Sequence, residues 1–494
     1  MLNVIFKTTI KLLSESKNQY VWLFIFVHPF LLFVSFWVDS LWFLIGVAFI
    51  PLFFFADVLP RNKTLLAIFI SVLTDVAVLG YPLINLRSVQ LIIPDFDQYT
   101  IVVGTIVGYA GLLALLWTLA IWIPLTFFRG LWARVIAVPS AWLIFEYVKM
   151  KFSFDLNWIF MGEPLIEFPP LAVFSRWGGP FVLSFLVLGF NVAAYEGIRT
   201  LFIGRERGRR WLPLAKTFVV LAFLIAFGWT YLKFDAERGR EDDTREAKTI
   251  TVAIVQPGSL YDQERQDAYF DKLRVSTREI VTPENTSVDV LVFPGNFFEG
   301  ITAEDLRDRD LARELLGFKP NAGAVLLGFP FWRDEKRYQT SALFSRSGGA
   351  QLSSKERLLP IADFIPPLLS SIYPILDILS SNYMPGEHQL LALLNKEILI
   401  GVISCSEEFI PAFSRRLKRE GASFLIVSGS VDDFKSAAVY KEALRAARFR
   451  AMENNIFVVQ AMKSGISAII DPRGRVLKYL PPGERGVLTG EVRI

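Results

Sequence analysis

The only cysteine of the chain, Cys405, closely follows a run of apolar and β-branched residues at 399–403 and precedes two carboxylates, Glu407 and Glu408. The run predicts a buried strand, and a thiol at the sharp turn after such a strand is held out of the sheet as a nucleophile. Free cysteines are also among the most buried residues, so a purely structural role for this thiol remains an alternative.

Polar side chains follow two other predicted strand ends. Glu299 comes after an apolar run at 288–293, and Lys355 and Asp363 lie in the loop after a predicted hairpin. Ligands bind at strand-end loops along one edge of an α/β sheet, so we expect these loops to meet the Cys405 turn. A lysine near a thiol lowers the pKa of the thiol and stabilises a developing oxyanion. The alternative is that the lysine and the acids are solvated surface residues.

The composition argues against several classes of site. The chain has one cysteine and two histidines, His28 and His388, which excludes an intramolecular disulfide and leaves almost no material for a metal site or a histidine-dependent triad. The net charge of +4 is modest, and the Lys and Arg residues are spread over short loops. Nucleic-acid binding is therefore not expected, and neither is a metal or another cofactor.

The elements that must position these side chains differ between the two halves of the chain. The 494 residues are 53% hydrophobic and 20% charged, and the apolar excess lies before about residue 235. We predict a transmembrane helical domain over 1–236, with about seven spans, and a soluble domain over 247–494. A span needs about 20 apolar residues, and the segments that reach or approach this length are 21–38, 41–58, 63–84, 101–128, 132–150, 180–202 and 211–234.

The charges between the spans predict their orientation. The loops after the second, fourth and sixth predicted spans contain Lys and Arg, most of all at 205–210. The positive-inside rule places these loops in the cytoplasm and the soluble domain outside it. The loop at 151–179 then also faces outward, and it is rich in aromatic residues, including Trp158. This loop is either an interfacial re-entrant segment or a lipid-binding wall.

From residue 249 the pattern changes to short apolar runs that alternate with helical patterns at 264–281, 303–316 and 434–453. Buried strands that alternate with helices are typical of a layered α/β domain. The predicted strands are 250–255, 288–293, 324–328, 398–403, 423–428 and 456–461, and a final hairpin joins 466–471 to 476–479.

This layout resembles the nitrilase superfamily and, more narrowly, the bacterial apolipoprotein N-acyltransferase family, which joins membrane helices to a nitrilase-like (carbon-nitrogen hydrolase) domain. The loop at 355–366 is similar to the family's Lys-x-x-Leu-Val-Pro-Phe-Gly-Glu-x-x-Pro motif, and the turn at 403–407 to its Ile-Cys-Tyr-Glu motif. Two further similarities are the closing stretches 448–453 and 464–474, and Asn157-Trp158 followed by Gly162, which looks like the family's Pro-Trp loop.

The resemblance implies an αββα sandwich outside the bacterial cytoplasmic (inner) membrane and a ping-pong acyl transfer. The Cys405 thiolate would take an acyl group from a phospholipid and pass it to the diacylglyceryl-cysteine amine of a lipoprotein. Lys355 would stabilise the oxyanion, Glu407 and Asp363 would support the site, and Trp158 would contact substrate. The implied partners are therefore a phospholipid acyl donor, a lipoprotein acceptor and the membrane.

One position departs from the family pattern. The family has its general-base glutamate where this chain has Gly295, and glycine carries no proton-accepting group. General acid–base catalysis contributes about 10²–10⁴-fold, so the chain would lose a factor of that size. Glu299 could replace the missing base, and Glu407 or Asp363 are the other candidates. The family's Ser-Asn-Asp turn is also replaced, by Ser428-Gly429-Ser430.

Three alternatives to the acyltransferase remain. The chain could be a catalytically impaired relative that binds lipid or lipoprotein without turnover, which Gly295 favours. It could be a membrane-tethered amidase of the nitrilase type, although such an enzyme needs neither seven spans nor the Trp158 loop. A transporter is least favoured, because the spans contain few ionisable residues, with Asp75 and Glu146 as exceptions.

Overall fold

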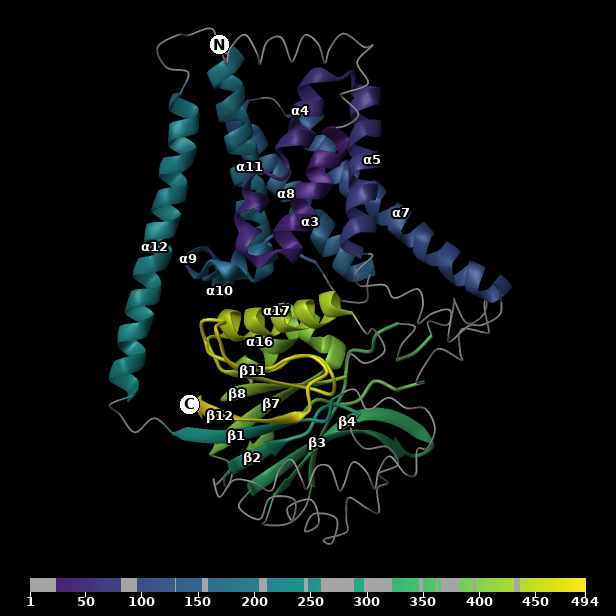
Figure 1. Ribbon diagram of the computed structural model, residues 1–494, viewed down its shortest axis with the longest axis vertical. Helices are drawn as coiled ribbons and strands as arrows, with labels where there is room; N and C mark the ends of the chain where they lie inside the picture. The colour runs from purple at the N-terminus through teal and green to yellow at the C-terminus, as the bar shows by residue number, and fades with distance from the viewer. Residues whose placement is uncertain are drawn as a thin grey trace. The chain divides into compact units, whose positions relative to one another are not determined.

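The computed structural model describes residues 24–80, 96–128, 130–152, 159–203, 211–243, 248–258, 288–296, 322–345, 350–360, 363–365, 382–393, 397–430 and 436–494 (Figure 1). The chain divides into two compact units. The helical unit contains Met1–Ser153 and Ile159–Glu237, and the α/β unit contains Phe154–Trp158 and Arg238–Ile494.

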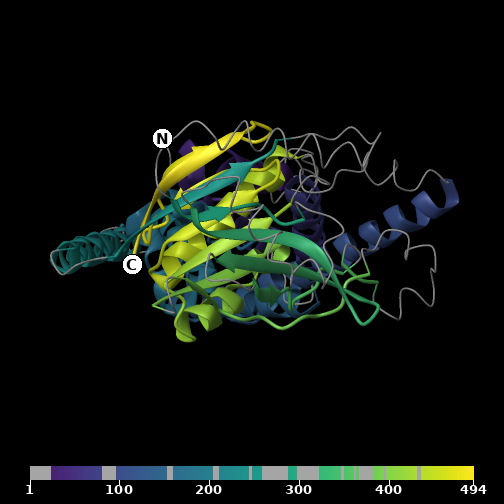
Figure 2. The same ribbon diagram turned by 90° about the horizontal axis from the view of Figure 1, so that it is seen from below.

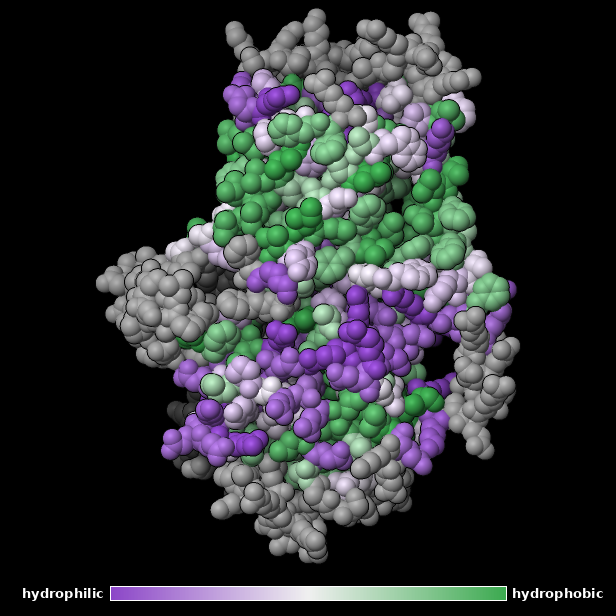
Figure 3. Space-filling model, turned by 180° about the vertical axis from the view of Figure 1, so that it is seen from behind, coloured by the Kyte–Doolittle hydropathy of each residue, from purple (hydrophilic) through white to green (hydrophobic). Residues whose placement is uncertain are grey.

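The helical unit has the length and apolarity of a membrane domain. Within the described residues, six helical segments are long and apolar enough to cross a bilayer. They are Asp39–Val58, Arg61–Gly80, Val107–Phe127, Leu131–Lys151, Pro180–Leu201 and Leu212–Glu237. The first predicted span, 21–38, contains the shorter apolar helix α3 (Val27–Trp37). Hydrophobic side chains cover most of the visible face of this unit, green in Figure 3.

The helical unit contains long α-helices together with several short helical segments. The α-helices are α4 (Ile50–Val58), α5 (Arg61–Gly80), α7 (Phe96–Phe127), α8 (Leu131–Phe152), α9 (Pro169–Ala172), α10 (Ser175–Gly178), α11 (Pro180–Ile203) and α12 (Leu212–Asp243). The 3-10 helices are η1 (Phe24–Phe26), η2 (Asp39–Gly46) and η3 (Glu163–Glu167). In Figures 1 and 2, α12 runs along the outside of the unit.

The segment predicted as one span over 41–58 is interrupted between η2 and α4. Such a break frees backbone groups, and lipid offers them no hydrogen bonds. Asn191 of α11 satisfies them: its Oδ1 accepts from the Phe49 N–H at 3.0 Å, and its Nδ2 donates to the Ile45 carbonyl at 2.8 Å. The break is thus tolerated because a fully buried amide from another helix completes it.

The α/β unit contains two six-stranded sheets. Their strand orders are β12-β1-β2-β3-β4-β5 and β11-β10-β9-β8-β7-β6. The first sheet is β1 (Thr249–Gln256), β2 (Val288–Val292), β3 (Ala322–Arg333), β4 (Lys336–Ser345), β5 (Ala350–Ser354) and β12 (Gly486–Arg493). The second is β6 (Leu391–Leu393), β7 (Ile398–Ser404), β8 (Phe424–Gly429), β9 (Val458–Met462), β10 (Ser467–Ile470) and β11 (Val476–Leu480). The strands predicted from apolar runs are confirmed.

Three buried clusters hold these layers together. One contains side chains from both sheets, such as Val290 of β2 and Val402 of β7, and forms the core between them. A second packs the other face of the second sheet against α16 (Pro411–Arg419) and α17 (Ala437–Asn454), the helix predicted at 434–453. The third lies on the other face of the first sheet. The helices predicted at 264–281 and 303–316 lie outside the described residues.

Parallel pairing sets the positions of the strand ends. β1, β2 and β3 pair in parallel in the first sheet, and β7, β8 and β9 do so in the second. Ser404, the last residue of β7, is in register with Ser428 of β8. The carboxyl ends of β7 and β8 therefore lie side by side, and the residues that follow them can form one site.

Candidate active site

Cys405 lies directly after β7 and begins the 3-10 helix η5 (Cys405–Phe409). Its φ angle of +50° is in the left-handed region, which non-glycine residues rarely occupy and which costs about 1–3 kcal/mol. The half-buried thiol lies 3.6 Å from the Ser430 carbonyl oxygen, to which it can donate. Burial raises the pKa of Cys405, and the nearby Lys355 ammonium opposes this shift.

Lys355 is buried, with 1% of its surface exposed, and its ammonium is paired. Its Nζ lies 2.6 Å from Oδ2 of Asp363, which also accepts from the Leu359 N–H at 2.6 Å. Burial acts to lower the pKa of Lys355, but the charges of Asp363 and Cys405 outweigh it and raise that pKa above its usual value. The lysine therefore remains a cation inside the protein, in the electrostatic field of the thiol.

Glu407 is fully buried and connects two of the loops. Its Oε1 accepts from the backbone N–H groups of Glu356 and Arg357, at 2.8 and 3.0 Å. Its Oε2 accepts from the Ser404 N–H at 3.0 Å, as part of a capping box at the start of η5. Burial raises the pKa of Glu407 to about 7, although the three N–H donors oppose that shift. With both oxygens occupied, Glu407 fixes the position of the nucleophile turn relative to the lysine loop.

Gly295 lies just beyond β2, against the end of β8 and the middle of β3. A Cβ atom at this position would stand 3.0 Å from the Ser428 carbonyl oxygen and 3.3 Å from the Cα of Gly429. A Cβ on Gly328, in β3, would stand only 2.6 Å from the Cα of Gly295. Gly429 is in turn close to the nucleophile, because a Cβ on it would lie 3.5 Å from the Cα of Cys405. Backbone therefore packs against backbone here.

The structure thus brings together four of the residues singled out in the sequence: Cys405, Lys355, Asp363 and Glu407. Glu299 and Trp158 lie outside the described residues. Neither of the other candidate bases is free, since Glu407 binds three N–H groups and Asp363 binds the lysine. Within the described part of the chain, no group of three or more His, Cys, Asp or Glu side chains could hold a metal ion.

Glu408 is a residue to which the sequence reasoning gave no role. It is buried at 1% exposure, and its Oε2 has no hydrogen-bond partner among the described residues. Burial raises its pKa well above the usual value, the Arg450 charge opposes this, and the Glu442 charge adds to it. Side chains three residues apart eclipse each other in a 3-10 helix. If a 3-10 turn over 405–409 had been predicted, it would have placed the side chain of Glu408 on the same side of the turn as Cys405.

Comparison with known proteins covers both units. The model of the apolipoprotein N-acyltransferase N-terminal domain matches residues 29–193, and the carbon-nitrogen hydrolase model matches residues 251–494. Together the two models match most of the chain, and the model of the helical part comes first. The second match confirms the predicted nitrilase-like α/β domain.

Several curated relatives are similar over most of their length. The apolipoprotein N-acyltransferase of Geobacter metallireducens is 28% identical over 74% of this chain and 69% of its own length. The protein of the same name from Neisseria meningitidis serogroup B is 25% identical over 76% and 71%. Among solved structures, a CN-hydrolase superfamily protein from Xanthomonas campestris is 17% identical, covering 50% of this chain and 91% of that chain, with a TM-score of 0.36.

Proposed function

Because this chain belongs to the apolipoprotein N-acyltransferase family, whose activity is the N-acylation of lipoproteins, we propose that it catalyses acyl transfer through a thioester on Cys405. The observation that carries the proposal is the Cys405 thiol at a strained strand-end turn, within the field of the buried Lys355–Asp363 pair. Functional sites are where such strain and shifted pKa values gather.

In the first half-reaction, Cys405 Sγ attacks the ester carbonyl carbon of a phospholipid. The carbon–sulfur bond forms, the ester carbon–oxygen bond breaks, and the thiol proton ends on the oxygen of the departing lysophospholipid. The negative charge that develops on the carbonyl oxygen is stabilised by the Lys355 ammonium, which Asp363 keeps protonated and oriented.

In the second half-reaction, the α-amine of the lipoprotein's terminal diacylglyceryl-cysteine attacks the thioester. An amide bond forms, the carbon–sulfur bond breaks, and a proton from the amine restores the Cys405 thiol. Glu407 acts here as a positioning residue, because its backbone contacts hold the lysine loop and the nucleophile turn in one arrangement.

The site is proposed to lie outside the cytoplasm, in the bacterial inner membrane, where a lipoprotein amine and phospholipid esters meet. The six apolar segments support a multi-pass membrane protein. The outward placement rests on the basic residues of the loops after the second, fourth and sixth predicted spans.

A second candidate function follows from Gly295. Gly295 has no carboxylate, and in the described part of the chain its position is packed against the backbone of Ser428 and Gly429. A protein with this site could bind a lipid or a lipoprotein without turnover. The acyltransferase is preferred because the thiol, the lysine, and the acids Asp363 and Glu407 are all in place around the turn.

Intact-mass measurement of the full chain, purified in detergent with phospholipid, distinguishes the two functions. An acyltransferase gains the mass of one acyl group, and the Cys405→Ala variant does not. A purified family member that becomes acylated under the same conditions serves as the positive control. An unmodified wild-type protein beside an acylated control would support the binding protein and exclude the thioester mechanism.

A further inference from the structure

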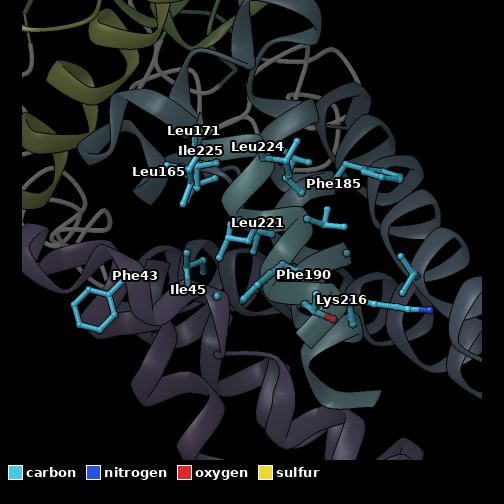
Figure 4. Close-up of a pocket in the computed structure, with 18 of the residues that line it drawn as sticks. Phe43, Ile45, Leu165, Leu171, Phe185, Phe190, Lys216, Leu221, Leu224 and Ile225 are labelled. Atoms are coloured by element: carbon cyan, nitrogen blue, oxygen red, sulfur yellow. The ribbon is translucent and has the colours of Figure 1, made fainter. Parts of the chain in front are cut away.

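A cavity of about 470 Å³ lies within the helical unit, between α12 and the helices α11, α8 and η2 (Figure 4). Its α12 wall is a regular stripe of residues three or four positions apart, which therefore share one face of the helix. They are Pro213, Lys216, Thr217, Val220, Leu221, Leu224 and Ile225. The cavity is thus a groove that runs along one face of α12.

Two close backbone contacts hold α12 against the rest of the helical unit on either side of this space. Near its start, Leu214 packs against Gly197 of α11, where a Cβ would stand 2.9 Å from the Cα of Leu214. Farther along, Gly228 packs against Pro170 of α9, where a Cβ would stand 1.8 Å from the Pro170 carbonyl oxygen. Leu214 and Gly228 are roughly 21 Å apart along the helix, from a rise of 1.5 Å per residue. All but one of the α12 residues that line the groove lie between these two contacts.

The walls of the groove are apolar except at one end. Lys216 is the one charged residue among the described residues that line it, and no carboxylate does. The lysine is exposed and lies near the start of α12, whereas Ile225 lies toward the other end of the stripe, near Leu165 and Leu171 in Figure 4. An apolar channel with a single cation at one end matches a molecule with a long tail and an anionic head.

The surroundings of the groove identify that molecule. Apolar cavities exclude water, and this one belongs to a unit with six membrane-spanning segments. The α12 residues that line the groove, Pro213 to Ile225, span roughly 18 Å at 1.5 Å per residue, which exceeds one leaflet of the hydrocarbon core, about half of 30 Å. A lysine near a membrane surface attracts anionic lipid head groups. A phospholipid acyl chain in the groove and its phosphate at Lys216 satisfy both features.

We propose that the α12 groove binds one anionic phospholipid, with an acyl chain along Val220, Leu221 and Leu224 and the phosphate paired with Lys216. The bound lipid fills the space between α12 and α11 and fixes α12 on the helical unit. The site consists of residues of the helical unit alone and does not depend on the chemistry of Cys405.

Native mass spectrometry of the full chain tests this site. The protein is prepared in nanodiscs of mixed phosphatidylglycerol and phosphatidylcholine, then released with the lipids it retains. We expect one retained phospholipid per chain, enriched several-fold in phosphatidylglycerol over the nanodisc composition. A wild-type protein that retains no phospholipid would contradict the proposal.

Two variants place a tryptophan in the groove, and one places a tryptophan elsewhere on α12. Leu221→Trp and Leu224→Trp should each lower the retained lipid at least fivefold. Val219→Trp, on the exposed face of α12 outside the groove, should leave retention unchanged. Equal retention in all three variants would place the lipid elsewhere.

Lys216→Gln tests the head-group contact without adding bulk. We expect this variant to retain a phospholipid but to lose the preference for phosphatidylglycerol. A preference that survives Lys216→Gln would overturn the assignment of the phosphate to this lysine. The substitution is at an exposed residue, so it remains informative if the tryptophan variants fail to fold.

Discussion

Gly295 lies so close to Ser428 that a Cβ atom on the glycine would stand 3.0 Å from the serine's carbonyl oxygen. This contact joins the end of β2 in one sheet to the end of β8 in the other. The glycine therefore does more than remove a carboxylate, because it lets the two sheets approach through their backbones next to the nucleophile turn.

We expect Gly295→Ala to destabilise the protein by about 1–3 kcal/mol, the usual cost of adding atoms to a packed interior. Thermal unfolding of the detergent-purified protein measures this change. Gly486→Ala is the matched control, since a Cβ there meets only a flexible leucine side chain at 3.5 Å. Its expected effect is within about 0.5 kcal/mol. Equal unfolding temperatures for both variants would show that the sheets do not touch at Gly295.

Lys355→Met should lower the rate of acyl-enzyme formation by about 10²–10³-fold, the typical cost of removing one oxyanion-stabilising group. Methionine has a similar length and removes the positive charge from a buried position. Time-resolved intact-mass measurement after adding phospholipid gives the rate. If Lys355→Met forms the thioester at the wild-type rate, the lysine has no role in the chemistry.

Glu407 should make the stability of the protein depend on pH. Its pKa is about 7 in the folded state, above the ordinary value of 4.5 for a free glutamate. Between these values the folded state binds the extra proton, so the free energy of unfolding falls as the pH rises from 4.5 to 7. A shift of this size corresponds to about 3 kcal/mol, from 1.36 kcal/mol per pKa unit.

Glu407→Gln removes this proton-binding group and should flatten the profile. Unfolding temperatures measured at intervals from pH 4.5 to 7 give the comparison. A slope that is unchanged in Glu407→Gln would assign the pH dependence to other groups, such as Glu408 or Glu453, whose pKa values burial also raises.

Glu408→Gln should make the Cys405 thiol more reactive. Burial is the main reason that the pKa of Cys405 is raised, and the Glu408 carboxylate adds to the shift. Removing that negative charge lowers the thiol pKa at any pH at which Glu408 is ionised. The rate of iodoacetamide alkylation, followed against pH, should move to lower pH in this variant. A profile that moves to higher pH would mean that Glu408 accepts the thiol proton instead.

Much of the α/β unit could be predicted from the sequence because its strands are buried on both faces. Such strands read as continuous apolar runs, and β7 and β8 were predicted to within a residue or two. The convergence of Lys355 and Cys405 also followed from their places after strand ends. These features depend on local pattern and on the geometry of parallel sheets.

Other features depend on contacts between distant residues, which local pattern does not record. Glu407 accepts hydrogen bonds from N–H groups 50 and 51 positions away in the chain, so both loops depend on its position. The span predicted over 41–58 is interrupted because Asn191 of another helix stabilises the break. The α12 groove results from two glycine contacts, and neither glycine stands out in a hydropathy profile.

The hydrogen bonds of Asn191 also set an order of assembly for the membrane domain. Asn191 follows Phe49 by 142 positions, so the ribosome completes the η2–α4 break long before its partner exists. At about 5–20 residues per second, that interval lasts roughly 7–28 s. Until α11 is synthesised, the Phe49 N–H and the Ile45 carbonyl lack the partners that Asn191 provides. Asn191→Leu would remove both hydrogen bonds permanently, so the expected defect of this variant is early degradation and not lost activity.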